Sequence, residues 1–134
     1  MLRARSELRV FKSKEFARFA RKNQLGDSVL CRAVAEIHAG TVDAELGGGA
    51  YKQRLRRSGE GKSGGFRGII LLRWKTIAIF VFGFAKSERA NIGPDELKAW
   101  RLIAKQLLTA PAAVRAAVDE GKLIEVLCDE KEIS

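Results

Sequence analysis

Histidine, tyrosine and cysteine, which often carry acid–base or metal chemistry, are scarce in this sequence. The 134 residues include one histidine, one tyrosine and two cysteines. His38 falls in a predicted helix away from the basic segments, which argues against imidazole acid–base catalysis. The acidic residues are scattered or stand at predicted helix starts, and their spacing is typical of neither a metal cage nor a glycosidase carboxylate pair. Any catalysis therefore has to depend on cationic side chains.

The two cysteines, Cys31 and Cys128, lie far apart in the sequence, and no second set of metal ligands stands near either of them. Such a pair is typical of neither a disulfide framework nor a zinc site. We therefore expect two buried, reduced thiols that behave as small apolar side chains.

Long apolar runs are also missing. The longest, residues 77–85, is far shorter than the roughly 20 residues that a helix needs to cross a bilayer. The first residues mix basic and polar side chains, with no apolar segment of a signal peptide behind them. We expect no transmembrane helix and a protein that remains in the cytoplasm.

The formal net charge is +9, and the excess is local. Residues 51–75 hold eight basic side chains against one acid, whereas residues 112–134 hold three against six. Clustered Lys and Arg gain affinity for phosphates by releasing condensed counterions, so a nucleic acid is the leading candidate partner. An anionic membrane would also attract them, but the basic stretch lacks the helical moment of an interfacial anchor. We expect the acidic surplus to lie outside the binding surface.

The length and composition, with 46% hydrophobic and 31% charged residues, predict one globular domain that spans residues 1–134. The order of elements predicts an α+β fold, with an N-terminal strand and helical hairpin, a largely antiparallel sheet and C-terminal helices. The periodicity predicts a strand at 8–11, helices capped by Ser13 and by Asp27 or Ser28, strands at 42–46, 51–56, 66–74 and 77–84, helices at 94–108 and 111–118, and a strand or docked tail at 123–127.

Basic side chains gather on the predicted central strands. Lys52, Arg54 and Arg56 share a parity, so they project from one face of a sheet. Arg67 begins an otherwise apolar strand, where a guanidinium needs an anion or hydrogen-bond partners, unless it extends to water at the strand edge. These residues predict a cationic sheet face.

The glycine-rich loop at residues 57–65 contains Gly61-Lys62-Ser63, which invites comparison with a nucleotide-binding P-loop. That motif requires a glycine where Arg56 stands and a helix after the serine, and here a strand follows. Two interpretations remain. Either Lys62 supplies charge beside a polyanion that approaches the glycines, or the segment is a solvated hairpin loop.

Aromatic and basic residues alternate after the last predicted central strand. Phe82, Phe84 and Lys86 share a face if that strand continues through them, and Arg89 follows shortly after. Rings beside cations suit single-stranded RNA, because unstacked bases stack on the rings while phosphates meet the cations. Packing in the core is the alternative for at least one of the two phenylalanines.

Three segments together resemble HigB-type members of the RelE toxin superfamily, and the similarity extends from about residue 11 to residue 127. They read LGGGAYKQR at residues 46–54, GKSGGFR at residues 61–67 and FGFAKSERAN at residues 82–91. The resemblance implies a RelE-like fold whose concave face binds messenger RNA in the ribosomal decoding site. It also implies cleavage without metal or cofactor, and a cognate helix-turn-helix antitoxin. Four residues match the basic positions of the family: Lys52, Arg54, Arg67 and Lys86.

Our mechanistic hypothesis is that the 2′-hydroxyl of the RNA attacks the adjacent phosphate. Lys52 is the candidate base, because neighbouring cations disfavour its charged form. Arg67 stabilises the charge that develops on phosphate, and Lys86 protonates the departing oxygen or holds the phosphate. The alternative is a non-catalytic nucleic-acid-binding protein or a gyrase-directed, ParE-like toxin. The candidate RNA-binding residues are Arg54, Lys62, Phe82, Phe84 and Arg89.

Overall fold

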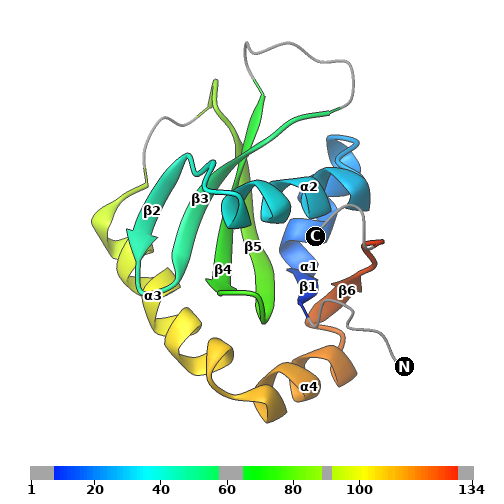
Figure 1. The fold of residues 1–134 in the computed structure, drawn as a ribbon, viewed down its shortest axis with the longest axis vertical. Helices are drawn as coiled ribbons and strands as arrows, with labels where there is room; N and C mark the ends of the chain where they lie inside the picture. The colour runs from blue at the N-terminus through cyan, green and yellow to red at the C-terminus, as the bar shows by residue number, and fades with distance from the viewer. Residues whose placement is uncertain (1–7, 58–64, 89–91, 130–134) are drawn as a thin grey trace.

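A computed structural model of the chain describes residues 8–57, 65–88 and 92–129 as a six-stranded sheet with helices on both sides (Figure 1). None of the helices in these ranges is long and apolar enough to cross a membrane. The elements are β1 (Arg9–Ser13), α1 (Lys14–Lys22), α2 (Asp27–His38), β2 (Ala44–Gly47), β3 (Ala50–Leu55), β4 (Phe66–Arg73), β5 (Ile77–Ala85), α3 (Pro94–Leu108), α4 (Pro111–Asp119) and β6 (Leu123–Val126).

The strands lie in the order β2-β3-β4-β5-β1-β6. Strand β1 runs parallel to β5, and every other neighbouring pair in the sheet is antiparallel. The β4–β5 hairpin occupies the centre of the sheet. The helices and the mostly antiparallel strand pairing confirm the predicted α+β class and largely antiparallel sheet. Strand β1 lies between β5 and β6, so the first and last strands of the described chain are neighbours at one side of the sheet.

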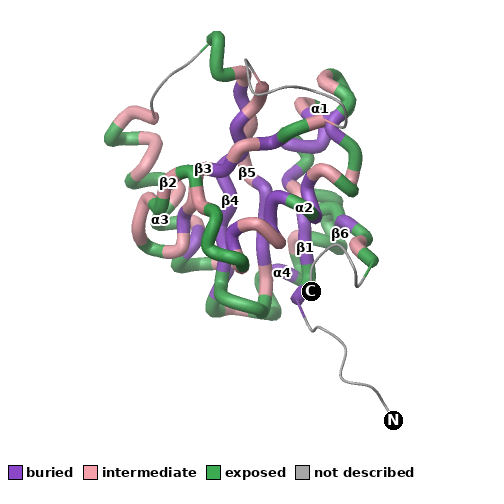
Figure 2. The backbone as a smooth tube through the Cα atoms, turned by 45° about the horizontal axis from the view of Figure 1, so that its top comes forward, coloured by how far each residue is buried: buried purple, intermediate pink, exposed green. Residues whose placement is uncertain are grey.

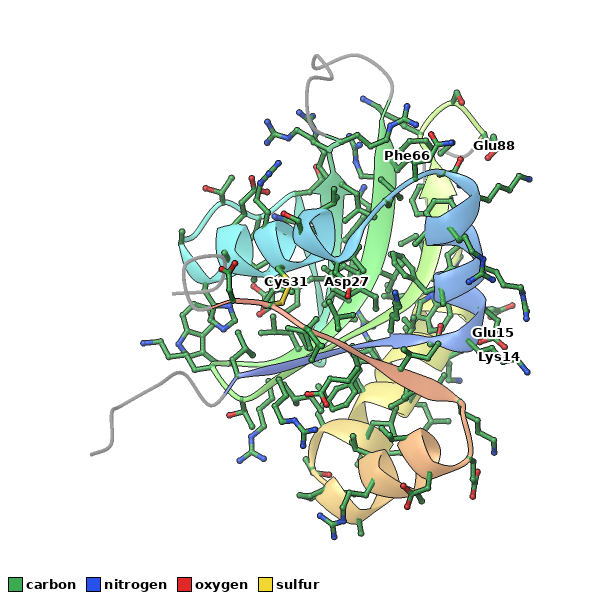
Figure 3. The ribbon with its side chains drawn as sticks, turned by 90° about the vertical axis from the view of Figure 1, so that its right-hand side faces the viewer. Lys14, Glu15, Asp27, Cys31, Phe66 and Glu88 are labelled. Carbon is green, nitrogen blue, oxygen red and sulfur yellow. A yellow bond between two sulfur atoms is a disulfide. The ribbon has the colours of Figure 1, made fainter. Side chains whose placement is uncertain are left out.

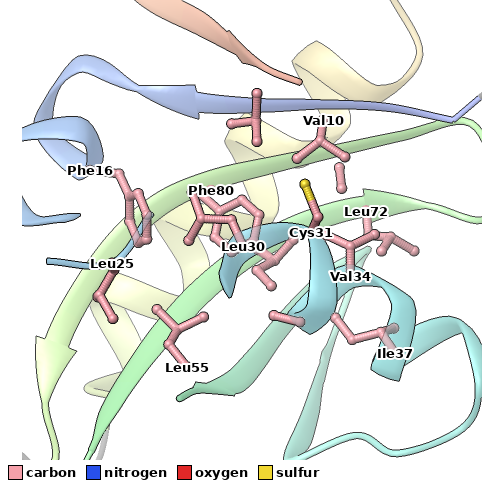
Figure 4. Close-up of a cluster of buried hydrophobic side chains, with 14 of the residues drawn as sticks. Val10, Phe16, Leu25, Leu30, Cys31, Val34, Ile37, Leu55, Leu72 and Phe80 are labelled. Atoms are coloured by element: carbon pink, nitrogen blue, oxygen red, sulfur yellow. The ribbon is translucent and has the colours of Figure 1, made fainter. Parts of the chain in front are cut away.

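Alternation along the strands divides the core between the two sheet faces. Helices α1 and α2 cover one face, where Phe16 and Leu30 pack against Phe80 of β5 (Figure 4). Helices α3 and α4 cover part of the other, where Ala104 and Val114 join a second cluster of buried side chains. The central strands are consequently the most deeply buried part of the chain (Figure 2).

The helix starts agree in part with the sequence analysis. Ser13 caps α1 as predicted, because its hydroxyl accepts a hydrogen bond from the backbone N–H of Phe16 at 3.0 Å. The cap predicted for the second helix was wrong, since Gly26 is the N-cap and Asp27 is the first helical residue. At that position the positive end of the helix dipole stabilises the carboxylate of Asp27, which also accepts a hydrogen bond from Lys12 at 3.1 Å.

The prediction of two reduced thiols was wrong. Cys31 of α2 and Cys128, which follows β6, form a disulfide with their Cα atoms 5.8 Å apart (Figure 3). The antiparallel pairing of β6 with β1 carries the chain end back beneath α2. A sequence separation of 97 residues hides this proximity, because it depends on the position of the last strand.

Candidate functional site

A β-bulge in β5 determines which side chains face the open part of the sheet. Ile69 pairs with Phe82 and Ile70 pairs with Phe80, so Val81 is an extra residue in β5. Regular alternation would have placed Phe82 and Phe84 on the same face as the buried Phe80. The extra residue moves both rings to the opposite face, which is a common use of bulges next to functional sites.

Three cations share that face with the two rings. Arg54 of β3 pairs directly with Arg67 of β4, which pairs in turn with Phe84 of β5. Lys52 pairs with Ile69 and has the same parity as Arg54. The structure therefore brings together five of the predicted site residues. We call them the cationic face: Lys52, Arg54, Arg67, Phe82 and Phe84.

Arg67 is nearly buried, with 7% of its side chain exposed, and it has an acidic partner that the sequence analysis missed. Oδ2 of Asp43 lies 3.3 Å from its Nε and 3.7 Å from Nζ of Lys52. The carboxylate offsets the mutual repulsion on which the argument for Lys52 as base relied. Asp43 lies within the strand predicted at residues 42–46 and directly before the observed β2, and it shares no motif with the basic segments. No sequence signal therefore pointed to its contact with Arg67.

The segment that carries Asp43 is held by Gln53, a β3 residue with only 2% of its surface exposed. Its Oε1 accepts a hydrogen bond from the backbone N–H of Asp43 at 2.9 Å. Its Nε2 donates to the carbonyl of Thr41 at 2.7 Å. Because Gln53 alternates with Lys52 and Arg54, it fixes the edge of the cationic face from the opposite side of the sheet.

Aromatic rings continue from the cationic face to α3. The ring centroids of Phe82 and Phe84 are 6.1 Å apart, and that of Trp100 in α3 is 5.8 Å from Phe82. Phe84 is buried, whereas Phe82 and Trp100 are partly exposed. Nε1 of Trp100 is buried with no acceptor among the described residues. Trp100 of α3 therefore continues the row of rings at one side of the face.

The other predicted basic residues differ in their placement. Lys86 is exposed in the turn after β5, where its backbone N–H donates to the carbonyl of Gly65 at 3.2 Å. Arg56 lies beyond the end of β3, and its Nη2 is 4.0 Å from Glu36 of α2, so its predicted place on the face was wrong. Lys62 and Arg89 lie outside the described residues.

The single histidine and the single tyrosine lie away from the face. Nδ1 of His38 lies 3.0 Å from the carbonyl of Val34, and its Nε2 accepts a hydrogen bond from the backbone N–H of Lys75 at 2.9 Å. Tyr51 packs against the core beneath α2, where burial and then the charge of Glu45 raise the pKa of its hydroxyl. Neither side chain supplies an acid or a base to the cationic face.

A family model described as RelE toxin of the RelE/RelB toxin–antitoxin system matches residues 8–126. A search of curated proteins gives no match. The matched range contains all six strands of the described sheet and both helices that follow β5.

Proposed function

The chain belongs to the RelE toxin family and is a toxin of a toxin–antitoxin system, and we propose that it inhibits translation as a ribosome-dependent mRNA endoribonuclease. Family membership also implies a cognate antitoxin as partner. In the proposal, a single toxin domain binds message on the ribosome through the cationic face, and the antitoxin is a helix-turn-helix protein.

The observation that carries this proposal is the nearly buried guanidinium of Arg67 on a sheet face that also holds Lys52 and Arg54. A charge held among protein groups interacts with a phosphate more strongly than an exposed one, because less water screens it. Phe82 lies beside these cations and is partly exposed, which suits stacking with an unpaired base. Single-stranded RNA offers both a phosphate and an unpaired base.

The proposed reaction uses a nucleophile that belongs to the substrate. The 2′-oxygen forms a bond to phosphorus while the bond between phosphorus and the 5′-oxygen breaks. The products are a 2′,3′-cyclic phosphate and a free 5′-hydroxyl. No metal or cofactor takes part in this step, because the nucleophile needs only a proton acceptor and the phosphate needs only cations to balance its growing charge.

Each cation has a role in this reaction. Lys52 in its uncharged form accepts the proton of the 2′-hydroxyl, and Asp43 then stabilises the ammonium that results. Arg67 stabilises the charge on the phosphorane oxygens. Lys86 gives a proton to the departing 5′-oxygen, since neither Phe82 nor Phe84 has a hydroxyl. The remaining groups hold the strand: Arg54, Lys62, Phe82 and Arg89. Phe84 is buried, as the alternative of core packing expected for one of the two rings, and supports Phe82 from beside it.

Single-turnover incubation with programmed ribosomes tests the proposal. We expect the purified chain to cut message within the decoding site, to leave a 5′-hydroxyl on the downstream fragment, and to cut the same free message far more slowly. The 5′ ends are mapped by primer extension, and their chemistry is read from whether a kinase can label them directly. Intact message on occupied ribosomes would instead assign the chain to non-catalytic nucleic-acid binders.

A further inference from the structure

We propose that Asp43 is a positioning residue for RNA cleavage, which holds Arg67 and Lys52 in the arrangement that meets the reacting phosphate. The inference rests on the nuclease function proposed above. It assigns a role to a side chain whose charge has the same sign as that of the substrate.

The contacts of Asp43 join the two cations that we assign to proton transfer and charge stabilisation. A single carboxylate oxygen, Oδ2, lies 3.3 Å from Nε of Arg67 and 3.7 Å from Nζ of Lys52. Nη1 of Arg67 donates to the carbonyl of Phe66 at 3.3 Å, and among the described residues no acceptor is found for Nη2. The carboxylate thus contacts the guanidinium at Nε, and the backbone carbonyl of Phe66 contacts it at Nη1, so two sides of the group are held by the protein.

The position of this carboxylate is set from the opposite side of the sheet. Gln53 is buried, and its amide bonds the backbone on both sides of residue 42, at the carbonyl of Thr41 and the N–H of Asp43. A buried side-chain amide with both ends satisfied holds its partners in one arrangement, because an alternative would leave a buried polar group unpaired. The backbone of Asp43 is therefore held in place by Gln53, independently of the contacts that its carboxylate makes with the two cations.

A carboxylate at a phosphate site carries an electrostatic cost, since like charges repel. If Asp43 only balanced the charge of Arg67, its removal would strengthen RNA binding and leave cleavage intact. If it only stabilised the fold, its removal would weaken binding and cleavage together. A positioning role gives a third pattern, in which binding is retained or strengthened while cleavage falls.

The experiment measures single-turnover cleavage of ribosome-bound message and the binding isotherm for Asp43→Asn in the full chain. We expect binding to be unchanged or a few-fold tighter through the lost negative charge. Cleavage should fall about 10- to 100-fold, on the scale of misplaced reacting groups. Asp43→Glu keeps the charge and should recover part of the rate. Glu45→Gln is the matched control, because it removes an exposed carboxylate two residues along and should leave cleavage unchanged.

A second variant tests whether the position of the carboxylate, and not its charge alone, is required. Gln53→Met keeps a buried side chain of similar length but removes both hydrogen bonds to the segment that carries Asp43. We expect it to slow cleavage without tightening binding. The double variant with Asp43→Asn should be no slower than the slower single variant, because both changes disturb one unit.

Several outcomes would overturn the inference. Full cleavage by Asp43→Asn would reduce Asp43 to a counter-ion, and parallel losses of binding and cleavage would reduce it to a stabilising contact. Additive effects in the double variant would remove Gln53 from the arrangement. A wild-type chain that fails to cut message in the same assay would overturn the proposed function itself, which separates the two failures.

Discussion

Arg67 is the residue on which the proposed chemistry depends most. It is the second residue of β4, with 7% of its side chain exposed, and it lies between Arg54 on one neighbouring strand and Phe84 on the other. Burial of a charge is expensive unless a partner compensates it, and Asp43 is that partner. The arrangement keeps a guanidinium in place and little screened by water, as a group that stabilises a developing anion must be.

The first prediction at this scale concerns the replacement of Arg67 by Ala. Because the group acts on charge that develops in the transition state, cleavage should fall roughly 100-fold or more, which is about 2.7 kcal/mol. Binding should weaken modestly, with the salt dependence reduced by about one unit, since other cations remain on the face. Single-turnover cleavage beside a binding isotherm separates the two effects, and circular dichroism verifies the fold.

Arg67→Lys is the matched variant for that experiment. It keeps the charge but cannot donate through two parallel N–H groups, so we expect it to restore binding and little of the cleavage rate. Equal losses of binding and cleavage in Arg67→Ala would make Arg67 one phosphate contact among several. Unchanged cleavage would leave it only the role of a buried partner for Asp43.

The residues of the cationic face could be predicted from the sequence to different degrees. Lys52 and Arg54 follow from simple alternation in one strand, and Arg67 from its place before an apolar run. Asp43 could not be predicted, because its contact with Arg67 depends on how a four-residue strand pairs at the sheet edge. Local periodicity predicts which side chains share a face of the sheet, but it does not predict that Asp43, from outside these strands, contacts them across the sheet edge at β2.

At the scale of elements, the bulge at Val81 has the largest consequence for the site. Without it, Phe82 and Phe84 would face α1, and the cations would lack aromatic neighbours. With the bulge present, it is Gly83 that faces α1, and an added Cβ there would lie 2.3 Å from the ring of Phe19. The order of elements was predictable from turns and periodicity, but an extra residue in one strand leaves no mark on either pattern.

The disulfide is the second element-scale feature, and it gives a prediction about stability. Cys31–Cys128 closes a loop with a sequence separation of 97 residues. In the chain-entropy account, a loop of that size stabilises the folded state by about 4.7 kcal/mol, and measured values are often smaller. We therefore expect the denaturation midpoint of the wild-type chain to fall when reductant is added. A reducing compartment would break the same cross-link.

Cys128→Ser provides the control for this measurement. Its midpoint should lie near that of the reduced wild-type chain and should not respond to reductant. RNA binding by the variant should be unchanged, since β6 and the cationic face lie at different parts of the sheet. An identical midpoint for oxidised and reduced wild-type chains would show that the cross-link adds nothing to stability.

For the molecule as a whole, the charges are separated along the sheet. The cationic face lies on β3, β4 and β5, whereas Glu120 follows α4 and Glu125 lies on β6 at the far edge, paired with Arg9 at 2.8 Å. These two acids of the described chain lie away from the cationic face. A polyanion that reaches the cationic face meets cations held on neighbouring strands, which favours a defined orientation over diffuse association.

The last prediction concerns messenger RNA in cells that express the chain. Induced expression without antitoxin should arrest growth and create new 5′ ends inside coding regions, because only translated message passes through the ribosomal site. Induction of Arg67→Ala should leave message largely intact, and Glu45→Gln should behave as wild type. Sequencing of mRNA 5′ ends makes the measurement, with translation blocked before induction as a further control. Arrest with intact message but broken or supercoil-altered DNA would instead indicate a gyrase-directed toxin, and arrest with both intact would indicate a binder that blocks translation by occupancy.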